Sequence, residues 1–588
     1  MNPVLLGVER SITGRRWQRR PGDERAALAI SQRLGLPELV GRVLAGRRVG
    51  IDEAEAFLNP TLRGFLPDPS TLRDLDLAAE RLAGAVMGGE KIALFGDYDV
   101  DGATSSALLA RFLGAAGART RLYIPDRRTE GYGPNAPALL KLKAEGAGLV
   151  IAVDCGTTAF EPIATAAQAG LDIIVVDHHE AEPALPKAFA IVNPNRLDQE
   201  PGLGHLAAVG VAFLLAIGTN RALRQAGWYQ QGRTEPDLMA WLDLVALGTV
   251  CDVVPLTGLN RALVSQGLKV MARRANAGLA ALADVAGMTE RPGAFHAGYI
   301  LGPRVNAGGR LGGADLGARL LATDDPEEAK AIARQLDGFN RQRQEVEAAV
   351  LYEAIEQVER DAQPDDAVLI AAGQGWHPGV VGIVAGRLKE RYARPALVIG
   401  IEEGVGKGSG RSVAGIDLGS AIIAARQAGI LDKGGGHAMA AGFTLRAERL
   451  PDLRQFLKDR LADQADTGLV PVLDLDGVLE VGGASLDLIE TIERCGPFGA
   501  GNDEPRFALS GAQIGKADLV GSGHVRCQLV GSSGARLKAI AFRVADSDLG
   551  LALLNSAGAP LHLAGTLRAD HWQGRKTVQF VIDDAGRV

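Results

Sequence analysis

Three aspartates alternate at the end of a short apolar run. Asp97, Asp99 and Asp101 stand in the segment GDYDVDG, residues 96–102. Three ionised carboxylates this close together repel one another unless cations lie among them. The segment therefore favours a metal site, while a solvated acidic loop or an isolated calcium loop remain as alternatives. No Glu stands at the twelfth position of the loop, which argues against an EF-hand.

Further carboxylates and imidazoles follow two later apolar runs. Asp154 ends one run, and Asp177, His178 and His179 end the next. A single histidine is more often structural than a ligand, but an adjacent pair at the end of an apolar run is less common. These residues are therefore candidates for the same site as the three alternating aspartates.

Asp252 lies among apolar residues in the segment LGTVCDVVP. Burying an unpaired carboxylate is costly, so Asp252 needs a cation or hydrogen-bond donors. A helix or turn cap is the alternative for this residue alone. Mixed carboxylate and imidazole ligands suit Mn²⁺ or Mg²⁺ better than a cysteine-rich zinc centre. Two such ions about 4 Å apart can clamp a phosphoryl group and activate water.

Alternating strands and helices position these residues. The expected strands are 91–95, 120–124, 149–153 and 173–176, and the helix-length segments among them include 103–116 and 137–145. This alternation is typical of a parallel sheet covered by helices. Ligands bind at the carboxyl ends of the strands in such sheets, which is where the acidic residues occur.

The rest of the sequence predicts five further regions. Residues 1 to about 70 and 207–287 are expected to be mainly helical. The sequence Asp-Pro-Glu-Glu at 325–328 starts a long charged helix, with Gly338 as the position where it could break. Alternating α/β structure resumes over 365–460, and short strands from about 470 predict a small all-β barrel.

Composition sets wide limits on the class of protein. The 588 residues suggest roughly three to five domains. The net charge of −7 neither indicates nor excludes a nucleic-acid ligand. The sequence has no apolar run of about 18 residues, no secretory signal and no closely spaced cysteines. We expect reduced thiols, a cytoplasmic location and no membrane partner.

The motifs together resemble the DHH phosphoesterase superfamily and, within it, its bacterial single-strand-specific 5′→3′ DNA exonucleases. The resemblance runs from about residue 50 to the C-terminus. Besides the acidic motifs it includes the segments GPRVNAGGRL at 302–311, WHPGVVGI at 376–383, GGGHAMAAGF at 434–443 and PFGAGN at 497–502.

The resemblance implies a fold of two α/β lobes, the DHH and DHH-associated domains, joined by a long helix and followed by an OB-like barrel. The implied parts are an N-terminal helical region (1–70), the DHH catalytic domain (71–322), the connecting helix (323–362), the DHH-associated substrate-binding domain (363–465) and an OB-fold-like nucleic-acid-binding domain (466–588).

It also implies two divalent ions, Mn²⁺ or Mg²⁺. Asp97 and Asp99 would hold one ion, Asp101, His178 and Asp252 the other, and Asp154 would bridge them. Many relatives carry a His two residues before the first of these acids, where this chain has Phe95. His179 is expected to face the phosphate, and Asp177 to orient the imidazoles. The expected catalytic residues are Asp99, Asp101, Asp154, His178, His179 and Asp252.

Several basic and polar residues are predicted to grip phosphate. Arg304 and Arg310 bracket a glycine-rich loop, and glycines around Ser409 and Arg411 would let backbone N–H groups approach an anion. For any single arginine a surface ion pair is the alternative. The full set predicted to bind nucleic acid or phosphate is Arg127, Arg304, Asn306, Arg310, Ser409, Arg411, His437 and Trp572.

The implied activity is two-metal hydrolysis of single-stranded DNA from the 5′ end to mononucleotides, in recombination and repair. A helicase or a single-strand-binding protein is the expected partner. A DHH-type oligoribonuclease or cyclic-dinucleotide phosphodiesterase is the alternative, although such enzymes typically lack the C-terminal module. A noncatalytic DNA-binding scaffold is a remote third, because all the acidic and imidazole motif positions are present.

Overall fold

The computed structural model describes residues 3–126, 129–361, 363, 366–465, 470–556, 558–572 and 575–588. The chain forms two compact units. The first unit comprises residues 1–302, 318–326 and 470–588, and the second comprises residues 303–317 and 327–469. No helix in the described ranges combines the length and apolar character needed to cross a membrane.

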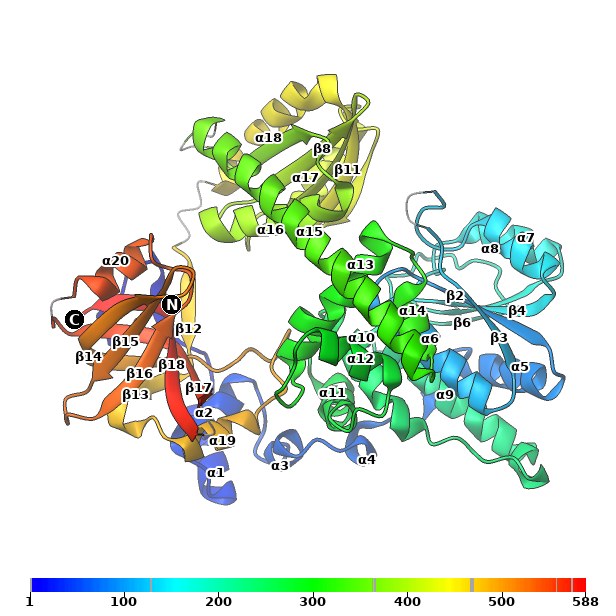
Figure 1. Cartoon of the computed structure of the whole chain (residues 1–588), viewed down its shortest axis with the longest axis horizontal. Helices are drawn as coiled ribbons and strands as arrows, with labels where there is room; N and C mark the ends of the chain where they lie inside the picture. The colour runs from blue at the N-terminus through cyan, green and yellow to red at the C-terminus, as the bar shows by residue number, and fades with distance from the viewer. Residues whose placement is uncertain are drawn as a thin grey trace. The chain divides into compact units, whose positions relative to one another are not determined.

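A five-stranded parallel sheet is the centre of the first unit, in the order β3-β2-β4-β5-β6. Its strands are β2 (Lys91–Gly96), β3 (Arg119–Tyr123), β4 (Ala147–Val153), β5 (Asp172–Val176) and β6 (Ala190–Val192). Its helices are α5 (Leu75–Met87), α6 (Val100–Ala115), α7 (Ala136–Ala144), α8 (Phe160–Gln168) and α9 (Ala208–Gln225). Helices α7 and α8 cover one face, and α5, α6 and α9 the other (Figure 1). Burial on both faces explains the almost continuous apolar sequences of β4 and β5.

A helical segment follows the sheet and packs against α6. It contains α10 (Leu242–Cys251), α11 (Gly258–Met271), α12 (Ala277–Val285) and the π-helix η5 (His296–Leu301). Helix α14 (Leu316–Ala322) lies close to the boundary between the two units in the sequence. The expected helical character of residues 207–287 is confirmed over α9 to α12.

The second unit is built on a mixed sheet in the order β10-β11-β9-β8-β7. Its strands are β7 (Leu369–Gln374), β8 (Ala396–Glu402), β9 (Val405–Arg411), β10 (Lys433–His437) and β11 (Ala440–Arg446). Its helices are α13 (Gly302–Leu311), α15 (Pro326–Asp361), α16 (Pro378–Tyr392), α17 (Leu418–Gln427) and α18 (Leu450–Ala465). Only β7 and β8 are parallel, and the other pairs are antiparallel.

Helix α15 is continuous through Gly338, so the break considered from the sequence does not occur. A glycine inside a helix costs about 1 kcal/mol relative to alanine. The side chains of Leu336, Asn340 and Arg343 are buried on either side of Gly338, and their packing holds the helix in register.

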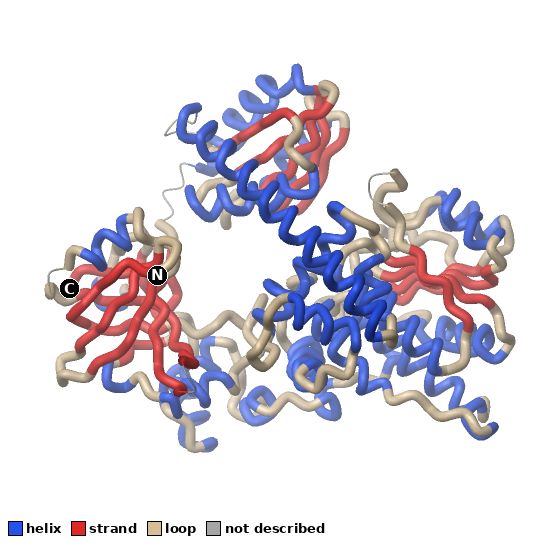
Figure 2. Tube along the Cα trace, in the orientation of Figure 1, coloured by secondary structure: helices blue, strands red, loops and turns tan. Residues whose placement is uncertain are grey.

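The C-terminal strands of the first unit close into a five-stranded barrel (Figure 2). Strand β14 pairs with both β15 and β17, which completes the ring β14-β15-β16-β18-β17. The elements are β12 (Val472–Leu475), β13 (Gly477–Leu479), α19 (Leu486–Glu493), β14 (Phe507–Val520), β15 (His524–Val530), β16 (Arg536–Ala541), α20 (Asp548–Leu554), β17 (Leu561–Trp572) and β18 (Arg575–Arg587). The all-β barrel expected from the sequence is confirmed.

The N-terminal region packs against this barrel. It is not wholly helical, because β1 (Arg16–Arg19) precedes α1 (Glu24–Leu34), α2 (Glu38–Gly46), α3 (Ala54–Leu58) and α4 (Leu62–Phe65). Strand β1 pairs in parallel with β12, more than 450 residues later. The side chain of Trp17 is fully buried, and its Nε1 donates a hydrogen bond to Asp584 Oδ2 at 2.9 Å. The sequence carried no local signal for this strand, because its partner is remote.

Substitution of Trp17 tests this packing. Trp17→Ala should lower the free energy of unfolding of the barrel by about 3–5 kcal/mol, because it leaves a large cavity. Trp17→Phe should cost about 1–3 kcal/mol, since Asp584 Oδ2 would lose its donor. Both changes in the free energy of unfolding can be measured by urea titration, with the hydrogen exchange of β12 and β18 as the local readout. Leu197→Ala, at a position that is 72% exposed, is the control. Equal stability of all three variants would show that the N-terminal strand contributes nothing to the barrel.

Candidate metal centre and phosphate-binding residues

The sheet register brings three acidic segments to one edge. Gly96 pairs with Val153, and Val153 with Val176, so β2, β4 and β5 end side by side. The residues that follow these strand ends are Asp97, Asp99, Asp101, Asp154, Asp177, His178 and His179. Phe95, two residues before Asp97, is fully buried and stacks on Tyr123 in the sheet.

Asp252 reaches the same place from α10, which it caps at the C-terminal end. Three groups of side chains converge closely enough to hold a cation, with ligand atoms within 4.8 Å of one another in each. One is Asp154, His178 and His179. The other two share no residue: Asp97, Asp99 and Asp154 form one, and Asp101, His178 and Asp252 form the other. His178 Nε2 lies 3.4 Å from Asp154 Oδ1 and so connects the two groups. These two groups correspond to the ligand sets implied by the resemblance, whereas the group with His179 was not among them. The role of each ligand remains a prediction.

Two carboxylate oxygens in this cluster fit a cation for a separate reason. Asp154 Oδ1 and Asp252 Oδ2 are buried and accept no hydrogen bond from the described residues. Burial, together with the neighbouring carboxylates, raises the pKa of Asp154 and Asp101, and it raises that of Asp252 to about 7. A bound cation would supply the missing partner and reverse the repulsion. Asp154 also has a left-handed backbone, with φ of 59°, which is typical of functional sites.

Helix ends hold the aspartates of the first motif. Asp99 caps α6 by accepting a hydrogen bond from the Gly102 N–H at 3.0 Å. Asp101 accepts from the N–H groups of Ala208 at 2.6 Å and Val209 at 2.9 Å, at the start of α9. The carboxylate of Asp101 is therefore fixed by a helix that follows about a hundred residues later. No local pattern in the sequence indicated this contact.

Asp177 fixes both histidines. Its Oδ1 accepts hydrogen bonds from the N–H groups of His178 and His179 and lies 2.7 Å from His179 Nδ1. Its Oδ2 accepts from the N–H and hydroxyl of Thr157. These hydrogen bonds hold the pKa of Asp177 below its usual range despite its burial, and the Asp177 contact raises the pKa of His179. The second histidine is thus favoured in its charged form, which suits the predicted contact with phosphate.

Three polar residues that sequence reasoning missed also contact this cluster. Tyr132 donates a hydrogen bond to the Asp154 carbonyl at 3.2 Å, and its hydroxyl lies 3.5 Å from His179 Nε2. Asn193 and Asn195 donate to the carbonyls of His179 and His178. Asn193 directly follows β6, so recognition of that three-residue strand would have placed it at the active edge. Tyr132 lies in a loop with no comparable signal.

The arginine motif is a helix, so the glycine-rich loop expected between Arg304 and Arg310 is wrong. Residues 302–311 form α13, because glycine permits a helix where neighbouring contacts favour one. Arg304 Nε donates to Asp337 Oδ1 of α15 at 3.0 Å, and Arg310 Nη1 donates to the Gly379 carbonyl at 2.6 Å. Asn306 lies half-buried in the same helix.

The segment around Ser409 is also not the predicted backbone cradle. It forms β9, whose neighbours β8 and β11 pair with it on both sides and occupy its N–H groups. The side chains of Ser409 and Arg411 are the groups in this segment that could contact an anion. They lie side by side, because Arg411 Nη1 donates a hydrogen bond to Ser409 Oγ at 3.0 Å. Both face Gly382 of α16, where an added Cβ would lie 3.0 Å from Ser409 Oγ and 3.1 Å from Arg411 Nη2.

Arg310, Ser409 and Arg411 therefore gather at the first turns of α16, beside Gly379 and Gly382. The N-terminus of a helix favours anions. Exposed His437 shares the sheet face of Arg411, because both residues pair with Ala440 from opposite sides. Arg127 and the side chain of Trp572 lie outside the described part of the structure.

Comparison with known proteins agrees with this geometry. Three family models match the chain: the DHH family N-terminal domain over residues 91–249, the DHHA1 domain over 365–463 and the RecJ OB domain over 475–584. These matches confirm the two α/β domains and the OB fold of the barrel. They define the chain as a DHH-type protein.

The particular family follows from full-length relatives. The single-stranded-DNA-specific exonuclease RecJ of Bacillus subtilis is 36% identical over 580 residues, covering 97% of this chain and 70% of that protein. The crystal structure of Thermus thermophilus RecJ with Mn²⁺ has a TM-score of 0.80 at 30% identity and covers 97% of this chain and 79% of that one. The corresponding complex with Mg²⁺ has a TM-score of 0.74 at 28% identity, with 97% and 78% covered. The chain belongs to the RecJ family.

Neutralising Asp154 tests whether this cluster holds a cation. Asp154→Asn removes one of several buried, mutually repelling carboxylates, so the metal-free variant should melt at a higher temperature than the metal-free parent. The same variant should lose most of the stabilisation that Mn²⁺ gives the parent, because ligand binding raises stability only where the site exists. Melting curves with EDTA and with Mn²⁺ measure both effects.

Asp546→Asn is the control, since Asp546 is exposed in the barrel domain. It should leave both melting temperatures within a degree or so of the parent values. An undiminished Mn²⁺-dependent shift in Asp154→Asn would place the cation elsewhere.

Proposed function

We propose that this chain is a metal-dependent exonuclease that degrades single-stranded DNA from the 5′ end to mononucleotides, in DNA recombination and repair. The observation that carries the proposal is the presence of two sets of carboxylate and imidazole ligands side by side, with His178 of one set 3.4 Å from Asp154 of the other. The names of the RecJ relatives, and the Mn²⁺ and Mg²⁺ held by the Thermus structures, support the substrate and the metals.

Different residues of the chain would bind the metal ions and contact the phosphate. Asp97, Asp99 and Asp154 would hold one divalent ion, and Asp101, His178 and Asp252 the other. Two such ions, Mn²⁺ or Mg²⁺, supply neutralisation of the phosphate charge and activation of water. His179, held by Asp177 through Nδ1, would donate a hydrogen bond from Nε2, which lies 3.5 Å from the Tyr132 hydroxyl, to a phosphate oxygen. No serine, cysteine or lysine nucleophile is required.

The group at the start of α16 supports recognition of a 5′-terminal phosphate. Ser409 and Arg411 would supply the side-chain donors, with Arg310 and His437 beside them. Arg304, Asn306 and Arg127 would contact the strand further along, and Trp572 would stack on a base. The assignments of Arg127 and Trp572 rest on the resemblance alone, and the others rest also on the positions given for α13, β9, β10 and α16.

We also propose the five-part division of the chain at 1–70, 71–322, 323–362, 363–465 and 466–588. The three family matches fall within its second, fourth and fifth parts. A helicase or single-strand-binding protein as partner, and a cytoplasmic location, belong to the same proposal, because an enzyme that resects DNA would be recruited where single strands form.

End-labelled substrates test the activity. Single strands labelled at the 5′ or the 3′ end, duplexes and RNA should be incubated with Mn²⁺, with Mg²⁺ and with EDTA. We expect labelled mononucleotide to appear at once from 5′-labelled single-stranded DNA, and no product with EDTA. Preferential hydrolysis of RNA or of cyclic dinucleotides would favour the alternative phosphodiesterases, and binding without hydrolysis would favour a scaffold.

A matched pair of glycine substitutions in α16 tests the terminal-phosphate site. Gly382→Ala places a methyl group about 3 Å from Ser409 Oγ and Arg411 Nη2, so it should displace both donors. A charged hydrogen bond contributes roughly 1.5–3 kcal/mol, so we expect the preference for 5′-phosphate over 5′-hydroxyl strands to fall about tenfold or more. The ratio of kcat/KM for the two strands is the measurement.

Gly386→Ala is the control, because an added Cβ there meets nothing within 4 Å. It lies one turn further along the same helix and should stabilise α16 slightly without changing the preference. If Gly382→Ala and Gly386→Ala retained the same preference as the parent, the terminal phosphate would bind elsewhere.

A further inference from the structure

A large cavity lies in the first unit, beside the end of α10. Its volume is about 1590 Å³, above the roughly 300–1,000 Å³ typical of small-molecule sites. The lining comes from the loop 58–61, the turn 250–256, residues 265–269 of α11, the segment 289–299 around η5 and the linker 493–506, with Arg568 of β17. Walls from several separate segments and this size suit a polymer better than a compact ligand.

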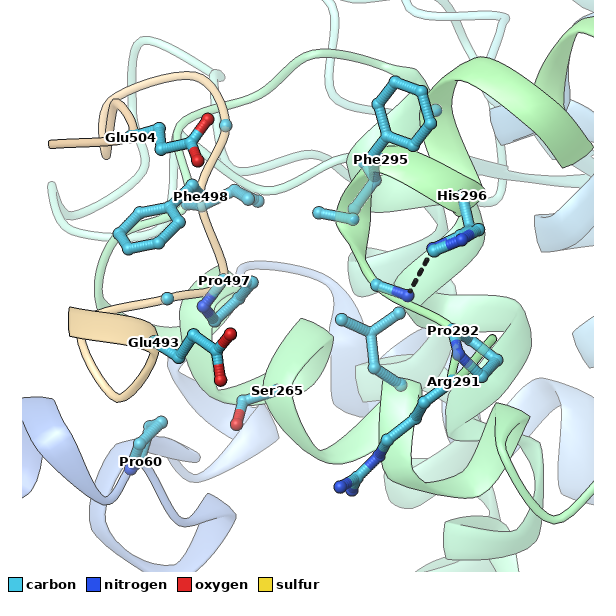
Figure 3. A pocket seen from close by; sticks show the side chains of 18 of the residues that line it. Pro60, Ser265, Arg291, Pro292, Phe295, His296, Glu493, Pro497, Phe498 and Glu504 are labelled. Carbon is cyan, nitrogen blue, oxygen red and sulfur yellow. Dashed lines mark hydrogen bonds between the residues drawn. The ribbon is translucent and has the colours of Figure 1, made fainter. Parts of the chain in front are cut away.

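Two aromatic rings of this lining are exposed to an unusual degree. Phe295 is 59% exposed and Tyr299 is 75% exposed. Their rings stack on each other, with centroids 5.3 Å apart and planes 24° apart. Phe498 of the linker lies on the opposite side of the cavity from Phe295 (Figure 3). Exposed aromatic faces of this kind are the surfaces on which unpaired bases stack in single-strand-binding proteins.

The helix η5, which carries Tyr299 and is preceded by Phe295, packs against the C-terminal end of α10. The Cys251 thiol lies 3.5 Å from the Ala297 carbonyl of η5, and a Cβ on Gly298 would lie 3.3 Å from Val250. Cys251 directly precedes Asp252 of the candidate centre. His296 Nδ1 accepts a hydrogen bond from the Gly293 N–H at 3.1 Å and fixes the start of η5 (Figure 3). Single π-helical turns occur frequently at functional sites.

The charges around the cavity fit weak, sequence-independent contacts with phosphates. Its basic lining residues are Lys269, Arg291, Arg494, Arg506 and Arg568, and its acidic ones are Glu290, Glu493, Asp503 and Glu504. Arg568 is paired with Glu504, and Arg506 with Asp583. Because these charges nearly balance, stacking rather than electrostatic attraction would dominate binding here.

We propose that this cavity binds unpaired nucleotides of the substrate strand on the 3′ side of the bond being cleaved, with bases stacked on Phe295 and Tyr299. This inference rests on the proposed function, since it extends the path of the same strand beyond the metal centre. It assigns to the segment 289–299 a role in strand binding that none of the motifs described above includes.

Binding of 5′-phosphorylated oligothymidylates of 6 and 30 nucleotides tests the proposal, in the full chain and with EDTA to prevent cleavage. Stacking of one base contributes enough for an alanine substitution to weaken binding about five- to a hundredfold. We expect Phe295→Ala and Tyr299→Ala to weaken binding of the longer strand by this factor. Tyr299→Phe should retain the affinity, and Tyr299→Leu should lose it, because only the former keeps the aromatic face.

Tyr352→Ala is the matched control, since Tyr352 is 64% exposed on α15, far from this lining in the sequence. It should bind both strands as the parent does. Strands with 5-iodouracil at successive positions give a second measurement: cross-links should map to peptides containing Phe295 or Tyr299 for one internal position and be absent for the 5′-terminal base.

The outcomes separate the two proposals. A parent protein that neither binds nor degrades single-stranded DNA would overturn the proposed function. A parent that does both, with Phe295→Ala and Tyr299→Ala binding the long strand equally well and cross-links mapping elsewhere, would overturn only this inference. The cavity would then belong to another class of ligand, such as a protein segment.

Discussion

Carboxylates that lie close together in a buried site repel one another, and the candidate metal centre of this protein is built from five of them. The register of β2, β4 and β5 places their ends together, so Asp97, Asp99, Asp101 and Asp154 must share one small volume with Asp252 from α10. The surrounding fold lowers the free-energy cost of this repulsion, because backbone N–H groups at the starts of two helices donate hydrogen bonds to Asp99 and Asp101. One oxygen of Asp154 and one of Asp252 accept no hydrogen bond from the described residues, so both can serve as ligands to a cation.

The imidazole pair solves a second problem, which is orientation. Adjacent histidines in a loop would sample many rotamers, yet Asp177 fixes the backbone of both and the ring of one. The Nε2 of His178 lies among the carboxylates, 3.4 Å from Asp154 Oδ1 and 3.6 Å from Asp252 Oδ2. Because one histidine faces the acids and the other has an elevated pKa, the two neighbours are suited to different tasks.

The second unit carries a different kind of chemistry. Its basic and hydroxyl side chains meet at the start of α16, where glycines leave room for them and the helix dipole favours an anion. Substrate polarity in the proposed reaction would arise from this anion site, while bond cleavage would depend on the carboxylates. The barrel, to which the N-terminal strand contributes through Trp17 and Asp584, adds the remaining OB-type module.

Local patterns in the sequence determined much of this protein. Short apolar runs predicted four of the five strands of the parallel sheet, and three of these runs are followed by the ligand candidates, because burial and periodicity are local properties. Contacts between distant parts of the chain were not predictable in this way: β1 beside β12, Asp101 at the start of α9, and Tyr132 against Asp154 became visible only in the folded chain. The same limit explains both errors about glycine-rich segments. Glycine allows loop, helix and strand alike, so neighbouring packing made α13 a helix and β9 a central strand.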